Sequence, residues 1–315
     1  MVTRDEKTQK KRDLDFSTTS YLNRASLPVR VFIYSFIAAL CLVCLLPFIN
    51  ILAVSLSQAQ AINKNPRMLF PEQITIEAYK YIFNTRTLLN SFGITVFATV
   101  VGTLFNLLVT TMGAYAVSKK NVPGQKIMMW IVIIPMLIGA GLIPTYLLYN
   151  ELKLIDSVWV LVVSGLVAPF NLILMRNFFW SIPDSINESA EIDGAGDLTI
   201  FFRIVLPLSK SVLATVGLFY AVGHWNDYFT GLYFINSNDK WPLQVMLKSI
   251  IIDFNMAGMG SIGGGVSTVD VSRLVLQPEN IRAATIIFSI VPILVLYPFL
   301  QKYFVKGVIV GSVKG

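Results

Sequence analysis

Four carboxylates stand close together in one polar segment of an otherwise apolar chain. The segment reads NESAEIDGAGDLTIFFRIVLPLS and contains Glu188, Glu191, Asp193 and Asp197. Catalysis at such a site would require a facing acid and base, a nucleophile triad or a set of metal ligands. The sequence offers none of these around the segment, so a membrane enzyme is not favoured. The elements on either side must explain why this polar stretch lies between two long apolar runs.

The composition is that of an integral membrane protein. Of the 315 residues, 55% are hydrophobic and 14% are charged, and the mean hydropathy is +0.66. A soluble domain carries roughly a quarter charged residues. The net charge of +7 is explained by basic residues that flank membrane spans on the cytoplasmic side, so no nucleic-acid partner is expected.

Six apolar segments are candidate spans, since about 20 residues cross the hydrocarbon core of a bilayer. They cover residues 31–55, 87–117, 127–148, 158–175, 212–235 and 281–300. Several contain proline or glycine, which spans tolerate where neighbouring helices satisfy the freed backbone groups. The sequence therefore predicts an all-α membrane bundle, with a transmembrane domain at 31–300.

Basic residues set the orientation of these spans. Sixteen of the 25 lysine and arginine residues lie in four segments on one side of the membrane, 1–30, 118–126, 176–210 and 301–315. Such residues are enriched in cytoplasmic loops, so both terminal segments are predicted to be cytoplasmic tails. The long outer loops are then 56–86 and 236–280, and the Gly-rich stretch of the second is predicted to be a flexible linker.

The polar segment carries the signals of a helix on the cytoplasmic membrane surface. This helix begins either at a capping box from Ser185 to Glu188 or in a frame set by Ser181 and Pro183. Gly194 is expected to end it, as glycine commonly does. The alternative is a solvated interfacial loop.

A second short helix is predicted to follow. Asp197 is a good cap for it, and Pro207 stops it. Between them, Leu198, Phe201 and Val205 share one side. The two helices together would form an elbow between the fourth and fifth spans.

The elbow resembles a known signature. The pattern E-A-A-x3-G-x9-I-x-L-P is typical of the inner-membrane subunits of binding-protein-dependent ABC importers. The matching positions here are Glu188, Ser189, Ala190, Gly194, Ile204, Leu206 and Pro207. Every spacing fits, and the one departure, Ser189 for alanine, exchanges one small residue for another.

The resemblance extends over nearly the whole chain. The stretches LNSFGITVFATVVGTLFNLLVTTMGAYAVSKKNVPGQK and IPTYLLYNELKLIDSVWVLV are similar to the spans of MalG-like sugar permeases. The WND at 225–227 and the ending YPFLQKYFVKGVIVGSVKG also match, the latter with the YtcP/LplC-like branch. The chain thus resembles one permease subunit of an oligosaccharide importer in a bacterial plasma membrane.

This resemblance implies a fold and a set of partners. The fold is the six-helix, MetI-like permease of type I importers, with a cytoplasmic coupling helix in the loop 181–210. The implied partners are a second homologous permease, two ATPase subunits that bind ATP and Mg, an extracellular solute-binding protein, the oligosaccharide and membrane lipid. No cofactor is expected in this chain itself, and the sequence contains no Walker A motif.

The resemblance also assigns roles to residues of the elbow. The signature positions, joined by Asp193, would sit in a cleft of the ATPase and follow its closure. Glu188 would be a cap or a partner-pairing group, and Gly194 would permit the tight turn. Lys314 and Gly315 are candidates for a second ATPase contact through the C-terminal tail. The alternative for the tail is a frayed basic end near anionic lipid.

A polar and aromatic cluster in the fifth predicted span is the candidate substrate path. Trp225 and Tyr228 offer flat faces to sugar rings, and Asn226 and Asp227 offer hydrogen bonds to hydroxyls. The alternative is an interfacial aromatic belt with polar neighbours. His224 is the only histidine, and a lone histidine does not make a zinc site, so no metal is expected.

Two asparagines, one in the second and one in the fourth predicted span, remain ambiguous from sequence. Asn106 and Asn171 could line the path or join helices to one another. An ion-coupled secondary transporter or channel is the competing function. That class would place ionisable residues in the centres of several spans, and the sequence shows one such cluster, at 224–227.

Overall fold

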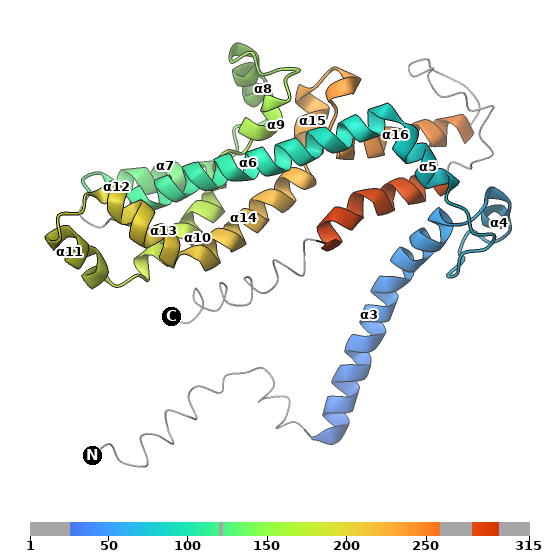
Figure 1. Ribbon diagram of the computed structural model, residues 1–315, viewed down its shortest axis with the longest axis horizontal. Helices are drawn as coiled ribbons and strands as arrows, with labels where there is room; N and C mark the ends of the chain where they lie inside the picture. Colours follow the sequence, from blue (N-terminus) through green and yellow to red (C-terminus); the bar gives the residue numbers. More distant parts are fainter. Residues whose placement is uncertain (1–25, 120–121, 259–278, 296–315) are drawn as a thin grey trace.

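The computed structural model describes residues 26–119, 122–258 and 279–295, and this part of the chain is helical. Figure 1 shows the long helix α6 (Arg86–Ser118) running the length of the bundle. Helices α11 (Asp184–Ile192) and α12 (Asp197–Ile200) lie at one of its ends, and α5 (Glu77–Asn84) and α16 (Leu243–Gly258) lie at the other.

Two described helices are each long and apolar enough to cross a membrane, α3 (Leu27–Ser55) and α6. Two bent pairs pass the same test when each is taken together. The first joins α7 (Gln125–Leu137) to α8 (Leu142–Glu151) at 118°, and the second joins Asp197–Leu208 to α14 (Lys210–Trp225) at 82°. The described residues therefore hold two such helices, or up to four if each bent pair is one span.

Helix α6 is the centre of the bundle. It packs along α14 and along α10 (Pro169–Trp180). Its buried positions are mostly small or polar, as is usual where membrane helices approach closely. They include Ser91, Thr95, Ala98, Gly102, Asn106, Thr110 and Ala114. By contrast, most of α3 is exposed in the isolated chain, and Figure 1 shows it standing away from the other helices.

Three predicted spans are interrupted in the structure. The span predicted at 127–148 is interrupted between the end of α7 at Leu137 and the start of α8 at Leu142. Gly141, directly before α8, has a positive φ of 81°. The span predicted at 158–175 becomes the short α9 (Trp159–Val163) and α10, which starts at Pro169 because proline suits the first helical turn. The span predicted at 212–235 ends as a continuous helix at Trp225, before α15 (Phe229–Phe234).

The predicted outer loops contain helices of their own. The first holds α4 (Ala59–Lys64) and α5, and an isolated bridge joins Ser57 to Ile74. The second holds the 3-10 turn Asn238–Lys240 and α16. The second outer segment is therefore helical as far as Gly258, and most of the Gly-rich stretch, predicted to be a flexible linker, lies outside the described residues. The last predicted span is helical over 279–295.

Candidate functional site

The first helix of the elbow, α11, begins at Asp184 directly after Pro183. No side chain caps its N-terminus, so the predicted capping box from Ser185 is wrong. The helix starts one residue after the proline, nearer to the second predicted frame. The hydroxyl of Ser189 donates to the carbonyl of Ser185 at 2.8 Å, which satisfies it within the helix.

The end of α11 confirms the expected role of Gly194. Its φ of +83° is the left-handed conformation that glycine adopts at little cost. The Gly194 amide donates to the Glu191 carbonyl at 3.0 Å, and the Ala195 amide donates to the Ala190 carbonyl at 2.9 Å. This pair of bonds is the Schellman motif, which satisfies carbonyls that the helix end leaves free.

The second arm of the elbow is one helical run, Asp197–Leu208. A π-helical turn at Phe201–Val205 leads into α13 (Leu206–Leu208). Pro207 lies inside α13, so the run passes the proline that was predicted to stop it and ends at Ser209. Pro207 lacks the N–H that an α-helix would direct to the preceding turn, and the wider π turn accommodates that loss.

The faces of the second arm differ in part from the prediction. Phe201 and Val205 are buried as expected, but Leu198 is 68% exposed and Ile200 is buried in its place. Of the signature positions on this arm, Ile204 and Leu206 are half-buried and Pro207 is exposed.

The elbow presents a mixed surface to the outside of the bundle. Glu188, Ser189 and Asp193 are exposed, whereas Ala190 is buried against the core. Between the carboxylates, Ile192 is 87% exposed. Ile192 was missed by sequence reasoning, although an apolar residue among carboxylates at the end of a polar helix is a signal for such a surface, and Leu198 was placed on the buried side instead.

The elbow is tied to the bundle by one cation. Lys119, at the end of α6, lies 3.1 Å from an oxygen of Asp197 and 3.7 Å from an oxygen of Glu191. Asp197 is the first residue of α12 and makes no cap bond, so its predicted role as a cap is wrong. Desolvation lowers the pKa of Lys119, but hydrogen bonds to Tyr115 and Asp197 outweigh it, and the net shift of the pKa is upward.

A groove of about 280 Å³ separates the elbow from the bundle. It is lined by Tyr115, Ser118, Lys119, Phe179, Trp180, Ile182, Asp184, Asn187, Glu188, Glu191 and Val205. The indole N–H of Trp180 donates to the Ser118 carbonyl at 2.6 Å, which joins α10 to α6 at the base of the groove. Glu188 therefore lies at the border between this groove and the exposed face of α11.

The candidate substrate-path residues follow one another at the end of α14, but their side chains separate. Trp225 is buried, and its indole N–H donates to the Ser289 carbonyl at 3.1 Å. Asn226 donates to the Val222 carbonyl at 2.9 Å. The Asp227 carboxylate accepts the Thr230 amide at 3.1 Å and so holds the start of α15.

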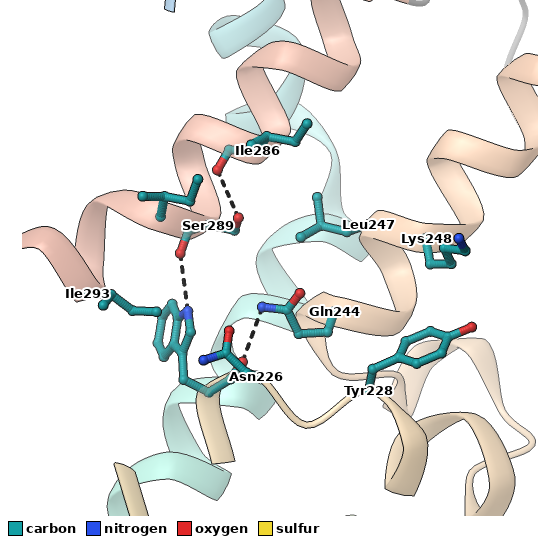
Figure 2. Close-up of a pocket in the computed structure, with 10 residues that line it drawn as sticks. Asn226, Tyr228, Gln244, Leu247, Lys248, Ile286, Ser289 and Ile293 are labelled. Atoms are coloured by element: carbon teal, nitrogen blue, oxygen red, sulfur yellow. Dashed lines mark hydrogen bonds between the residues drawn. The ribbon is translucent and has the colours of Figure 1, made fainter. Parts of the chain in front are cut away.

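A cavity of about 460 Å³ brings three of these residues together. It is lined by Trp225, Asn226, Tyr228, Gln244, Leu247, Lys248, Ile286, Ser289, Ile290 and Ile293. Figure 2 shows Asn226 and Tyr228 opposite α16, with the helix 279–295 closing a further side. Sequence reasoning missed the α16 residues because it treated that segment as a loop. Asp227 does not line the cavity.

Polar groups inside the bundle join helices. The Nε2 atom of His224 lies 2.6 Å from the Asn106 Oδ1 atom, and the Asn106 amide donates to the carbonyls of Gly165 and Leu166. Asn106 is thus satisfied by contacts that join α6 to α14 and to the turn before α10, in keeping with the second of its two predicted roles. Lys314 and Gly315, the candidate tail contacts, lie outside the described residues.

Comparison with known proteins agrees with the resemblance noted from the signature. Residues 110–310 match the family described as "Binding-protein-dependent transport system inner membrane component". The polygalacturonan/rhamnogalacturonan transport system permease protein YtcP of Bacillus subtilis is 40% identical over 285 residues, covering 90% of this chain and 97% of YtcP. Protein LplC of the same organism is 43% identical over 272 residues, covering 86% of this chain and 90% of LplC.

A solved structure shows the same fold. It is a bacterial ABC transporter involved in the import of the acidic polysaccharide alginate, and one of its chains matches with a TM-score of 0.80 at 33% identity. The match covers 89% of this chain and 99% of that chain. The family match also spans the elbow, the cavity and the helices between them. The chain belongs to the family of binding-protein-dependent transport system inner membrane components.

Proposed function

We propose that this protein is the permease subunit of an ATP-driven importer of an oligosaccharide that an extracellular solute-binding protein delivers. The family and the sugar permeases among its relatives support this class of substrate. In this proposal a second, homologous permease completes the pathway, and two separate ATPase subunits bind ATP and Mg. This chain carries no ATPase site of its own.

One observation carries the proposal. The signature segment, which is partly exposed, continues through a bend at Ser209 directly into α14, and α14 ends at the cavity. The 16 residues of α14 span about 24 Å at ~1.5 Å per residue. A displacement of the elbow is therefore transmitted by one packed helix to the residues that line the cavity.

The surface of the elbow suits a protein partner. Exposed Glu188 and Asp193 provide polar contacts, and exposed Ile192 and Leu198 provide apolar area that a partner would bury. We assign this surface to the ATPase and keep Lys314 and Gly315 as candidates for a second contact with it.

The proposed topology has six spans and both termini in the cytoplasm of a bacterial cell. The asymmetry of basic residues supports it, as does the placement of the elbow and of α16 at opposite ends of α6 (Figure 1). Cysteines introduced at Asp197 and at Lys64 test it. An impermeant thiol reagent applied to intact cells should label the Lys64 position and leave the Asp197 position unlabelled. The reverse labelling would overturn the topology.

Reconstitution tests the function itself. The chain, its partner permease, the ATPases and the loaded binding protein should together import oligosaccharide into proteoliposomes only when ATP is present. Uptake driven by an ion gradient without ATP would instead identify the ion-coupled class. The cheapest first step is a glycan panel on the binding protein, followed by uptake of the glycans that it binds.

A further inference from the structure

We infer that Lys248 makes the cavity between α14, α16 and the helix 279–295 selective for an anionic oligosaccharide, whose sugar carboxylate it binds. This inference rests on the proposed function and deepens it. Of the ten side chains that line the cavity within the described part of the chain, Lys248 is the only charged one. The other polar lining groups are amides, hydroxyls and an indole, so the net electrostatic preference of the cavity is for an anion.

Lys248 has no salt-bridge partner among the described residues, which distinguishes it from two other lysines that have specific partners. Lys240, on the turn before α16, lies 2.9 Å from Asp156. Lys119 lies 3.1 Å from Asp197. The carboxylate nearest in sequence to the cavity, Asp227, accepts the Thr230 amide instead. The charge of Lys248 is therefore available to a carboxylate that comes from outside the described chain.

The groups around Lys248 suit a sugar. Gln244 lies one helical turn before it, so the two side chains share the cavity-facing side of α16. The Gln244 amide uses one N–H on the Trp225 carbonyl at 3.2 Å, which leaves its second N–H and its oxygen for a ligand. Figure 2 shows Tyr228 on the same side of the cavity as Lys248, where it offers a ring face and a hydroxyl.

The size and the character of the cavity also fit. Its volume of about 460 Å³ lies within the ~300–1,000 Å³ of small-molecule sites, which combine apolar walls with a few placed polar groups. Leu247, Ile286 and Ile293 supply the apolar walls. A carboxylate on an ammonium forms a charge-assisted hydrogen bond, and such bonds are stronger than those between neutral groups. A uronate oligomer would thus be favoured over a neutral one of the same length.

The test compares acidic and neutralised forms of one sugar. Oligogalacturonates and oligoalginates of defined length, and the same oligomers with methyl-esterified carboxyl groups, are offered to the reconstituted complex at limiting concentration. In Lys248→Gln, uptake of the acidic forms should fall at least about tenfold, while uptake of the methyl esters should stay within about twofold. Lys248→Arg should retain most of the acidic uptake, and the exposed Lys64→Gln should leave both unchanged.

Several outcomes would overturn the inference. Unchanged acidic uptake in Lys248→Gln removes the carboxylate contact, and equal loss of both forms shows a structural role instead. A defect that vanishes in proteoliposomes without anionic lipid identifies a lipid headgroup as the bound anion. If the wild-type complex imports a neutral oligosaccharide but no uronate, the inference fails and the proposed function stands. If it imports no oligosaccharide that the binding protein delivers, both fail.

Discussion

The ammonium of Lys119 lies 3.1 Å from Asp197, so the end of α6 is bonded to the second arm of the elbow. The same ammonium lies 3.7 Å from Glu191 on the first arm. Both carboxylates are more than half exposed, and exposed ion pairs contribute only about 0–1 kcal/mol. The contact is therefore weak enough to break and reform, and it joins both arms of the elbow to the end of α6.

Replacing Lys119 should uncouple the elbow without unfolding the bundle. In Lys119→Gln, both ion pairs are lost, and we expect the free energy of unfolding to fall by less than about 1 kcal/mol. Uptake per ATP hydrolysed should fall, since the elbow can then move without carrying α6. The control is Lys126→Gln, an exposed lysine near the same loop. If the two variants have the same transport-to-ATPase ratio, Lys119 has no part in coupling.

Gly194 should tolerate side chains according to their backbone preference and not their size. A Cβ atom added there meets no atom within 4 Å, so the cost of Gly194→Ala is the left-handed conformation, about 1–2 kcal/mol. Asparagine adopts that conformation more readily, so Gly194→Asn should be milder. Comparison of Gly194→Asp with Gly194→Asn then isolates the effect of the added charge beside Asp193.

The readout for these three variants is retention of the ATPase on purification and its stimulation by loaded binding protein. We expect retention to decrease from wild type through Asn to Ala, with Asp below Asn by the effect of charge. Normal retention and stimulation in both Ala and Asp would contradict the assignment of this elbow to the ATPase.

Gly102 should be intolerant for the opposite reason. Its Cβ position is 2.5 Å from the Nε2 atom of His224, which is held by Asn106. Gly102→Ala would displace this ring, and we expect destabilisation of about 1–3 kcal/mol, as for other overpacked sites. On the same helix, Gly93 has nothing within 4 Å of its Cβ position. Gly93→Ala should therefore be neutral or stabilising in thermal unfolding in detergent, and equal effects at the two glycines would be evidence against this packing.

The elbow was predictable from sequence where its signals are local. The end of α11 at Gly194 could be predicted because a helix and the glycine that ends it lie within a few residues of each other. The positions of the signature are also close together in sequence. The contact between Lys119 and Asp197 joins residues far apart in sequence, and the hydrophobic periodicity of the chain does not indicate such a contact. Trp225 is a residue type that commonly stacks on sugar rings. Its burial, however, depends on contacts with Ser289 and the helix 279–295, which are distant in sequence.

The breaks in the spans were not predictable for a related reason. Apolar composition indicates which residues prefer lipid or a core, but it does not fix where a helix is interrupted. Gly141 and Pro169 each permit a break without requiring one. At the second break the packing against α6 contributes to the outcome, because Asn106 donates to two carbonyls of the turn before α10.

An acid-sensitive anchor is expected at the opposite end of the bundle. The Ser237 hydroxyl and Lys240 bind the Asp156 carboxylate, with the backbone amides of Ser237 and Asn236, and they hold its pKa far below the usual range. A lowered folded-state pKa stabilises the structure above the unfolded-state pKa of about 3.9. That stabilisation is lost progressively as the pH falls below this value toward the folded-state pKa.

Hydrogen exchange of the amides at 236–240 measures this anchor. From neutral pH to about pH 5 their protection should be constant after correction for intrinsic rates, and it should decrease below about pH 4. Asp156→Asn should reduce protection at neutral pH, whereas Asp239→Asn, an exposed carboxylate in the same turn, should not. Equal protection in the two variants at neutral pH would show that the Asp156 contacts do not hold the turn.

The bend at Ser209 joins the second arm of the elbow, Asp197–Leu208, to α14, and the two helical segments act as the two arms of a crank. The arm Asp197–Leu208 is about 18 Å long and α14 about 24 Å, at ~1.5 Å per residue. With arms of similar length set 82° apart, a stroke at the ATPase end swings the other end through a comparable distance in a nearly perpendicular direction. The ratio of the two arm lengths is about 1.3, so the width of the opening at Asn226 would be set mainly by the stroke of the ATPase and only slightly by amplification within the membrane.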